Sequence, residues 1–470
     1  MLGLAANHAQ AGEPSGGPAE GTGNPQTPAA SKQETLTDLF SPSRANLLSD
    51  AGGLRTFLAK YGITIAVQDT NELFGNATGG IKRGANYDAL TQMGLGVDAA
   101  KAFGWQGGTF NISAFQIRGR NLNSTNLLDL QTYSSIAADP ATRIWELWYQ
   151  QSFFGGKMDV KVGQQSIDQE FILSQDSLLF INAMTGWPLL PSADMYASGP
   201  TYPLSSPGIR LRDHPTDSIT LLAGVFQDNP PGGPFLDDSQ LRGSSAWGGN
   251  FLHLTSTGAL FIAEAQYAAN QSGGTNPGLP GTYKIGAWFD TAPFPNPRFD
   301  TAGVSLAAPN SNGVPQMEYG NFGIYGLIDQ MIWRPSADSP QSLNLFIRPM
   351  GAPADRNPVE FSIDGGATLK APFKGRDNDT LGLAVGVGQV SNYASARDED
   401  AALFAGAPMP VRSTETFIEA TYQCQVAGWW QLQPDFQYFI RPGGGIPDPN
   451  DPMRRVGNEA VFGLRSVVSF

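Results

Sequence analysis

The sequence predicts an all-β fold, a transmembrane antiparallel β-barrel with a short N-terminal helix, and three observations support this class. Stretches of roughly 8 to 12 residues that alternate apolar and polar side chains recur from residue 62 onward. No run of about 18 to 20 consecutive apolar residues occurs, which excludes membrane-spanning helices and leaves a closed barrel as the way to cross lipid. The chain ends on an amphipathic strand in which Phe462, Leu464 and Val468 share the face of Phe470, as in bacterial outer-membrane barrels.

Composition limits the functional classes to which the chain could belong. Its 470 residues carry a formal net charge of -13, and only 15% of them are charged. Nucleic-acid-binding proteins carry clustered positive charge, so this acidic balance argues against a nucleic-acid partner. A single cysteine, Cys424, permits no internal disulfide, and the low content of His and Cys argues against a structural zinc site.

The N-terminal part of the sequence divides into three segments. Residues 1–11 end in the small-x-small pattern AQA, which predicts the remnant of a signal peptide cleaved after Ala11; the alternative is an ordinary flexible tail. Residues 12–44, most clearly 12–32, are rich in Gly, Pro and Ala and predict a disordered linker. Residues 45–61 have apolar side chains at helical spacing and predict a short helix, which the Gly-Gly pair within it is expected to break.

The barrel itself is predicted over residues 62–470, where thirteen stretches read as strands. They are ITIAVQDTNELFG, GGTFNISAFQIRGRN, RIWELWYQQSFF, KMDVKVGQQSI, SITLLAGVFQD, ALFIAEAQYAAN, TYKIGAWFD, FGIYGLIDQMIW, SLNLFIRPM, TLGLAVGVGQV, ETFIEATYQCQV, WWQLQPDFQYFIRP and NEAVFGLRSVVSF. Short turn clusters such as FGGK and DHPTD alternate with long loops at 182–207, 227–247, 293–316 and 394–410. Tight turns on one side and long loops on the other are typical of outer-membrane barrels.

Alternation within these strands separates two faces. In TYKIGAWFD, Tyr283, Ile285, Ala287 and Phe289 lie opposite Lys284, Gly286, Trp288 and Asp290, and in FQIRGR, Gln116, Arg118 and Arg120 lie opposite Phe115 and Ile117. A soluble β-sandwich produces the same alternation, so this pattern alone does not choose between the two folds. Aromatic residues near strand ends suit the interfacial girdles of a barrel: Trp105, Tyr149, Trp288, Trp333, Trp429 and Trp430.

Several longer motifs carry a resemblance to a known family. They are LLSDAGGLRTFLAKYGI, TFNISAFQIRGRNL, KVGQQSIDQEF, SGPTYPLSSPGIRLRDHPTDSITLLAGVFQDNP and the closing run WWQLQPDFQYFIRPGG … NEAVFGLRSVVSF. With these motifs the chain resembles the OprB family of carbohydrate-selective porins from about residue 46 to its end. The resemblance implies about sixteen strands, passive diffusion of glucose-like sugars across the outer membrane into the periplasm, contact with outer-membrane lipid, a homotrimer and no cofactor.

A sugar-selective pore needs hydrogen-bond donors and acceptors in a narrow ring, with an aromatic face for the C–H surface of the sugar. Arginine suits the donor side because its planar fork offers several N–H groups. Parity predicts lumen-facing positions for a constriction set: Arg118, Arg120, Glu146, Trp148, Arg210 and Arg212, with Lys161 joining through its shared face with Asp159 and Gln165. The loop at 182–207 is expected to fold inward and narrow the channel. A purely electrostatic role for each of these residues is the alternative to direct sugar contact.

Other signals favour simpler interpretations. The GLGVDA run at 94–99 resembles a dinucleotide-binding turn, but we expect a glycine-bearing strand because no βαβ context surrounds it. The dispersed histidines His8, His214 and His253 argue against metal binding, and the acidic run at 398–400 predicts a solvated loop. Nothing in the sequence suggests catalysis. Two alternatives to a sugar-selective pore remain, a general porin without sugar preference and a secreted all-β protein that binds or cleaves glycans.

Overall fold

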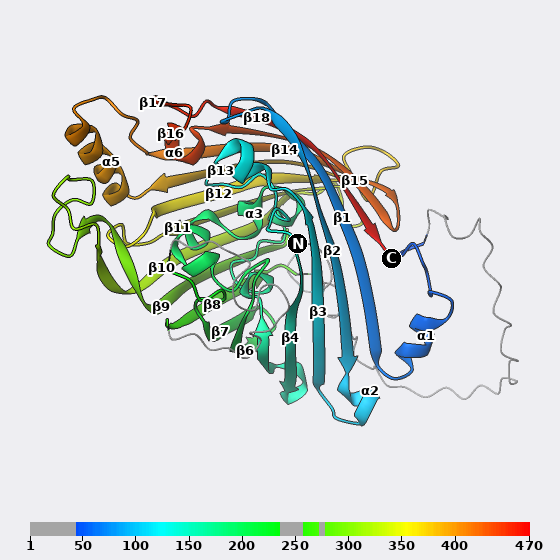
Figure 1. Ribbon diagram of the computed structural model, residues 1–470. Coiled ribbons are helices and arrows are strands. Elements are labelled where there is room, and N and C mark those ends of the chain that lie inside the picture. Colours follow the sequence, from blue (N-terminus) through cyan, green and yellow to red (C-terminus); the bar gives the residue numbers. More distant parts are fainter. Residues whose placement is uncertain (1–43, 236–256, 272–277) are drawn as a thin grey trace, which may run out of the picture.

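A closed antiparallel β-barrel makes up most of the protein (Figure 1). The structure, a computed structural model, describes residues 44–235, 257–271 and 278–470. The predicted signal remnant (1–11) and nearly all of the predicted linker (12–44) lie outside these residues. Within them, no helix is long and apolar enough to cross a membrane.

Sixteen of the described strands form the barrel wall, each paired with its sequence neighbours until β18 closes the ring by pairing with both β15 and β1. A closed ring has no free edge, so the prediction of a barrel is confirmed and the alternative of a two-sheet sandwich is wrong. The strands are β1 (Ile63–Thr78), β2 (Gly84–Asp98), β3 (Gly108–Gly119), β4 (Ala141–Phe153), β5 (Met158–Gln165), β6 (Ser206–Thr216), β7 (Ile219–Gln227), β8 (Ala259–Ala269), β9 (Gly281–Asp300), β10 (Pro315–Trp333), β11 (Ser342–Gly351), β12 (Val359–Lys370), β13 (Thr380–Val390), β14 (Thr414–Ala427), β15 (Trp430–Ile440) and β18 (Glu459–Ser469).

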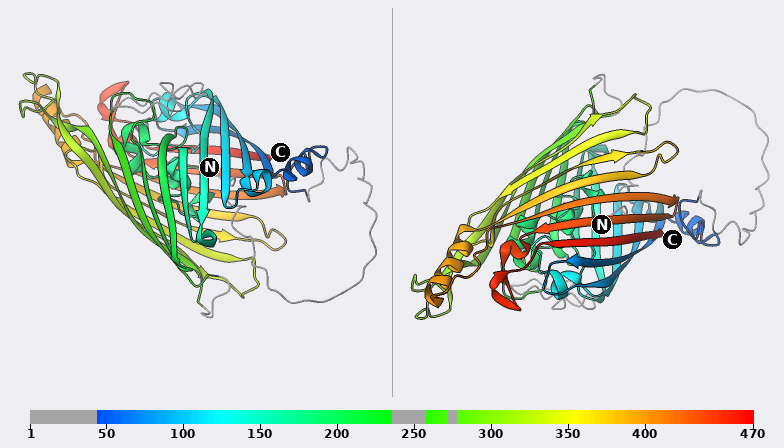
Figure 2. Two further views of the ribbon diagram at one scale, coloured as in Figure 1. Left: turned by 90° about the horizontal axis from the view of Figure 1, so that it is seen from below. Right: turned by 90° about the horizontal axis from the view of Figure 1, so that it is seen from above.

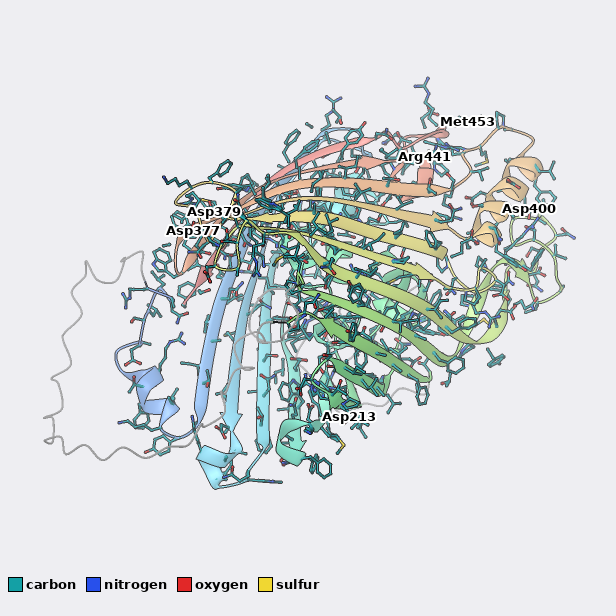
Figure 3. All side chains as sticks on the ribbon, turned by 180° about the vertical axis from the view of Figure 1, so that it is seen from behind. Asp213, Asp377, Asp379, Asp400, Arg441 and Met453 are labelled. Atoms are coloured by element: carbon teal, nitrogen blue, oxygen red, sulfur yellow. The ribbon has the colours of Figure 1, made fainter. Side chains whose placement is uncertain are left out.

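The two ends of the barrel differ as the sequence predicts. One end, here called the terminal end, carries the start of β1, the end of β18 and mostly short connections such as the turn at 217–218. The opposite end, here called the loop end, carries the long connections, including 166–205 and 391–413. Among the residues labelled in Figure 3, Asp379, just before β13, marks the terminal end and Asp400 marks the loop end.

Alternation along the strands separates an outer surface from the lumen. On β9, Ile285 and Phe289 are exposed, whereas Trp288 and Asp290 are buried inside the barrel. Exposed large apolar residues recur on the outer surface of most other strands, as expected for a wall in lipid. The predicted girdle position of Trp288 is therefore wrong. Its parity turns the side chain inward, so it belongs to the interior of the barrel.

Three strands of the wall, β2, β6 and β12, were not among the thirteen predicted stretches. Their sequences contain residues that weaken the strand pattern, such as Pro207 and Pro215 in β6 and the Gly365-Gly366 pair in β12. Pairing with neighbours on both sides overrides these weak local preferences. The number of strands, about sixteen by resemblance, is confirmed.

The helices are short and lie in the connections. They are α1 (Leu54–Ala59), α2 (Ala99–Phe103), α3 (Ala183–Gly186), α4 (Leu189–Asp194), α5 (Asn392–Ala405) and α6 (Pro442–Gly445), and a small hairpin of β16 (Pro447–Asp448) and β17 (Asp451–Arg455) precedes β18. The N-terminal helix is narrower than the predicted 45–61, because Gly52 and Gly53 have positive φ angles of 70° and 94° and place a turn before it.

Two predicted loops contain regular structure. The region 394–410 is mostly the helix α5, which Ser391 caps through its side chain and which packs against β9. In the region 293–316, β9 continues to Asp300 and β10 already begins at Pro315. Figure 2 shows that α5 and the far ends of β9 and β10 project together beyond the rest of the loop end. Contacts between these elements stabilise structure that neither stretch predicts alone.

The connection between β5 and β6, residues 166–205, folds into the barrel and is here called the inserted segment. It carries α3, α4 and several 3-10 turns, and Figure 1 shows α3 inside the ring of strands. Its apolar side chains, including Phe171, Leu179 and Leu190, form a core with inward residues of the wall such as Phe346 and Phe417. The expectation that this loop folds inward is confirmed, although the segment begins earlier than residue 182.

Candidate functional site

Carboxylates on the inner wall hold the inserted segment in place. Glu419 on β14 accepts hydrogen bonds from the backbone N–H groups of Ile181 (2.6 Å) and Asn182 (3.1 Å). Glu264 on β8 accepts one from the N–H of Ile172 (2.8 Å), and Asp329 on β10 accepts one from the N–H of Gln175 (3.1 Å). These contacts satisfy backbone donors that would otherwise be buried without partners.

The inner face of β13 has the small side chains that this arrangement needs. Gly382, Ala384, Gly386 and Gly388 alternate along that face. A Cβ atom on Gly382 would lie 2.6 Å from Leu179 Cδ2 and 2.8 Å from Phe180 Cε1, both in the inserted segment. The glycines therefore make room for the segment to pack directly against the wall.

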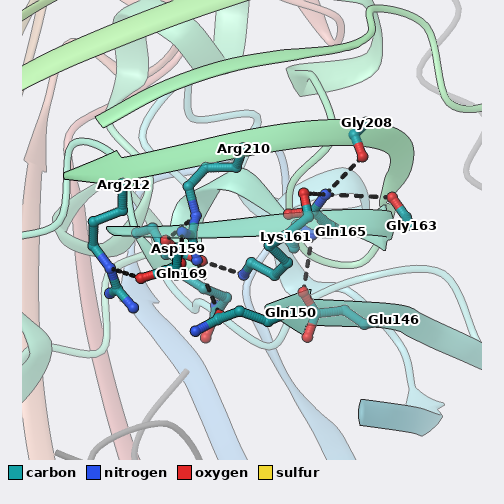
Figure 4. A network of polar contacts seen from close by, with 12 residues as sticks. Glu146, Gln150, Asp159, Lys161, Gly163, Gln165, Gln169, Gly208, Arg210 and Arg212 are labelled. Carbon is teal, nitrogen blue, oxygen red and sulfur yellow. Dashed lines mark hydrogen bonds and ion pairs between the residues drawn. The ribbon is translucent and has the colours of Figure 1, made fainter. Parts of the chain in front are cut away.

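A network of charged residues joins the inserted segment to β5 and β6 (Figure 4). Arg210 on β6 is 1% exposed and forms ion pairs with Asp159 on β5 and with Glu170 of the inserted segment (Nε–Oε2, 2.7 Å). Lys161 on β5 forms a second ion pair with Glu170. Glu170 is therefore held by two cations of the wall, and in return it fixes their positions.

Two members of this region remain accessible from the lumen. Arg212 pairs with Asp159 (2.8 Å), and its side chain is 33% exposed. Trp148 on β4 is half-buried, and the Lys161 ammonium lies 4.8 Å from the centroid of its ring. The wall thus presents the Arg212 guanidinium, positioned by Asp159, and the Trp148 ring, positioned beside Lys161.

The charges around Glu170 determine its ionisation. Burial alone would raise the pKa of this carboxyl, but the opposite charges of Lys161 and Arg210 outweigh burial and lower it to about 2. Glu170 is therefore ionised at neutral pH. Because Lys161 and Arg210 are buried in ion pairs with Glu170, Arg212 is the cation of this group that is best placed to contact a solute.

Inward residues that keep partial exposure are mostly neutral amides. Gln68 on β1, Asn111 on β3, Gln150 on β4 and Gln266 on β8 share the inward parity of their strands and are half-exposed. An amide offers both donors and an acceptor, so these residues give the solvated part of the lumen a polar but uncharged lining.

The structure brings five of the seven predicted site residues to the inner wall of β4–β6. Lys161 and Arg210 are opposite each other on β5 and β6, and the backbone N–H of Ser166 donates to Glu146 (3.0 Å) at the start of the inserted segment. The five are Glu146, Trp148, Lys161, Arg210 and Arg212.

Arg118 and Arg120 do not belong to this wall. Arg118 donates to Asp69 (2.8 Å) and Thr91 (3.0 Å), whose parity places them on the outer surface, so its predicted lumen position is wrong. Arg120 lies beyond the end of β3 in an exposed connection at the loop end. The reason is that the apolar Phe115 and Ile117, not the arginines, face inward and pack against Trp145.

Sequence reasoning missed the residues that hold the inserted segment, Glu170 above all. Its partners Lys161 and Arg210 lie on strands that precede and follow the segment, so no local spacing reveals the contacts. A weak signal was present for Glu264, because it is an isolated charge on the inward parity of β8, a strand otherwise rich in apolar residues. Glu419 shares the inward parity of β14 with a second carboxylate, Glu415.

A polar group of residues interrupts the apolar outer surface of β1–β3. Asp69 and Asn71 lie mid-strand between the outward Val67 and Leu73, and Arg118 and Thr91 bond to Asp69 from the neighbouring strands. At comparable positions, the outer surface from β8 to β13 presents Phe261, Ile285, Ile324, Ile347 and Leu383. One side of the barrel therefore differs chemically from the rest.

The remaining sequence signals give no second site. The GLGVDA run forms the end of β2 and the first residue of α2, a short helix that was not expected, but β2 and β3 pair antiparallel, so no βαβ unit exists there. His214 bonds to Thr220 (2.9 Å), whereas His8 and His253 lie outside the described residues. Among described residues, no group of three or more His, Cys, Asp and Glu is arranged to hold a metal ion.

The acidic run at 398–400 lies on α5 rather than on a solvated loop. Asp398 pairs with Arg412 (2.8 Å), and Asp400 pairs with Arg298 at the far end of β9 (2.9 Å). The run therefore fastens α5 to its neighbours.

Comparison with known proteins gives consistent matches over nearly the whole chain. Residues 82–470 match the family model described as carbohydrate-selective porin, OprB family. Porin B of Pseudomonas aeruginosa is 23% identical over 463 residues, which cover 91% of this chain and 92% of the relative.

Solved structures agree with the fold. The high pH structure of Pseudomonas putida OprB aligns with a TM-score of 0.79 and 24% identity, covering 92% of this chain and 100% of that one. The low pH structure of the same protein aligns with a TM-score of 0.55 over the same shares.

Proposed function

The chain belongs to the OprB family of carbohydrate-selective porins, and we propose that sugars cross its barrel along the wall of β4–β6, past Trp148, Gln150 and Arg212. The protein is an integral β-barrel of the outer membrane and a pore for carbohydrates. Its relatives are channels rather than enzymes, and we propose passive diffusion of glucose-like mono- or disaccharides into the periplasm, without catalysis or cofactor.

The observation that carries the proposed path is the exposure of Arg212 and Trp148 beside an inserted segment that fills other parts of the lumen. A sugar that enters this space must exchange water for protein partners on every hydroxyl group. The guanidinium of Arg212 donates to hydroxyl oxygens, the amides of Gln150 and its neighbours donate and accept, and the Trp148 ring packs against C–H groups. Each contact is modest, so the solute is selected without being retained.

Planar-bilayer conductance tests this proposal directly. We expect glucose, and less strongly a disaccharide, to block the wild-type channel in a saturable way. Arg212→Gln should weaken the block by about tenfold, because it removes charged hydrogen bonds to the solute. Arg298→Gln is the matched control: Arg298 is also 33% exposed and paired with an aspartate, but it lies at the projecting end of β9.

The outcomes separate the alternatives. Channels that conduct salt but are not blocked by sugar would identify the protein as a general porin without sugar preference. Block that is equal in wild type and Arg212→Gln would leave the sugar-selective pore standing but remove Arg212 from the path.

We further propose that the protein forms a homotrimer through the outer surface of β1–β3. An arginine on the lipid side of a barrel costs about 2–4 kcal/mol near the bilayer midplane. The Asp69–Arg118 pair lies on this surface, with Asp69 midway along β1, so contact with another copy of the chain would lower that cost by covering the pair with protein instead of lipid.

A further inference from the structure

Arg348 pairs with one carboxylate and, in addition, donates hydrogen bonds to the backbone of the inserted segment. It lies on the inner face of β11, is 0% exposed, and pairs with Asp364 directly opposite on β12 (Nε–Oδ1 3.1 Å, Nη2–Oδ2 2.9 Å). That bidentate pair uses one edge of the guanidinium. The remaining N–H groups point into the barrel.

Those N–H groups reach both arms of the inserted segment. Nη2 donates to the carbonyl oxygens of Met184 (2.9 Å) and Thr185 (2.9 Å), and Nη1 donates to that of Gly186 (3.2 Å). These carbonyls end the helix α3, where no intrahelical donor is available to them. Nη1 also donates to the carbonyl of Ile172 (2.8 Å) in the preceding arm.

Ile172 shows that the segment is held under strain at this point. Its φ angle is +60°, in the left-handed region that a β-branched residue rarely adopts. Its N–H donates to Glu264 and its carbonyl accepts from Arg348, so both sides of the strained residue are held by the wall. Such a conformation persists only when its surroundings impose it.

We propose that Arg348 is a positioning residue of the inserted segment: by clamping residues 172 and 184–186 to β11 and β12 it sets the width of the channel, and thereby solute selection. The second part of this statement rests on the proposed function. A planar guanidinium is suited to the task because one group can serve a carboxylate and several carbonyls at fixed angles, which an ammonium cannot.

The test uses the purified full-length barrel and begins with amide hydrogen exchange. In Arg348→Gln we expect exchange within residues 172–186 to rise roughly 100-fold, because breaking a buried charge pair favours local release of the segment. Salt conductance of single channels should rise at the same time, and block by glucose should weaken. Heat-modifiable mobility in gel electrophoresis, a difference between unheated and heated samples, confirms that the barrel itself has folded.

Arg465→Gln is the matched control. Arg465 is also a buried arginine of the inner wall and pairs with Glu72, but its further contact is Ser135 in the connection between β3 and β4. The N–H of Ser135 donates to the carbonyl of Ile181 (2.8 Å), so Arg465→Gln should raise exchange in 172–186 far less than Arg348→Gln does, and it should leave salt conductance close to wild type. If Arg348→Gln fails to fold, Asp364→Asn and Arg348→Lys take its place, each with a smaller increase in exchange.

The proposal is overturned if exchange in 172–186 is unchanged, or rises no more in the Arg348 and Asp364 variants than in Arg465→Gln. Exchange and salt conductance do not depend on sugar. A wild-type channel that ignores glucose would therefore contradict the proposed function while leaving the clamp intact, and the two failures can be told apart.

Discussion

Glu170 is the residue on which the order of the charged wall depends. It pairs with both Lys161 and Arg210, and these cations hold its pKa at about 2, compared with an ordinary value of 4.5. Because the folded-state pKa is lowered, the ionised carboxylate stabilises the protein at neutral pH by about 3 kcal/mol. This contribution is lost as the pH falls from about 4.5 toward 2.

We expect Glu170→Gln to remove that pH dependence. Between about pH 5 and pH 2, the free energy of unfolding of wild type should fall by about 3 kcal/mol more than that of the variant. Urea unfolding of the barrel in detergent at several pH values measures the difference. Glu399→Gln, which changes an exposed carboxylate on α5, should behave as wild type. Identical pH slopes in wild type and Glu170→Gln would refute the assignment.

At the scale of the element, β13 shows how a strand is adapted to what packs against it. Its outer face carries the exposed Leu381, Leu383 and Val385, whereas its inner face is reduced to glycine and alanine. The outer face matches the apolar lipid and the inner face matches the volume of the inserted segment. Both requirements are met by a strict two-residue alternation.

A larger side chain on that inner face should displace the segment. Gly382→Val would place new atoms against Leu179 and Phe180, so we expect a loss of about 1–3 kcal/mol in the free energy of unfolding through overpacking, together with higher salt conductance. Gly326→Val is the control, because a Cβ there meets nothing closer than 3.9 Å. Conductance that is unchanged in Gly382→Val would show that the segment does not depend on this face.

At the scale of the whole molecule, the outer surface is asymmetric. Most of it presents apolar side chains, but Asp69, Asn71, Thr91 and Arg118 form a hydrogen-bonded polar group on β1–β3. In a barrel surrounded by lipid on all sides, such a polar group would be destabilising. In a barrel that contacts further copies of the chain, protein can cover it.

Charge reversal tests this arrangement. Arg118→Glu places a second negative charge beside Asp69, and we expect it to shift the protein from trimer toward monomer, as measured by native mass spectrometry in detergent. The repulsion of two carboxylates is on the order of 1 kcal/mol or more per subunit. Arg298→Glu, which breaks an ion pair of similar exposure at the loop end, should remain trimeric. A trimer that survives Arg118→Glu, or a monomeric wild type, would contradict the proposed interface.

Much of this architecture is predictable because it depends on short-range pattern. The alternation in TYKIGAWFD and the closing strand before Phe470 appear in the barrel as expected. Strands such as β6 and β12, where Pro and Gly weaken the pattern, form because neighbours on both sides supply hydrogen bonds. Their presence follows from closure of the ring rather than from their own residues.

The sequence by itself therefore determined the fold class, most of the wall and the family, because alternation and motif order are properties of consecutive residues. Only the tertiary structure decided which face is the lumen in a strand such as β3, where sequence parity favoured the wrong face. Polar residues need not point inward when inward-folded connections bring apolar side chains into the barrel: Phe115 on β3 packs with Ile136 of the β3–β4 connection and with Tyr202 of the inserted segment, whereas Arg118 faces outward. Only the tertiary structure also reveals the roles of Glu170 and Arg348, because these roles arise from contacts between the inserted segment and strands that lie elsewhere in the chain.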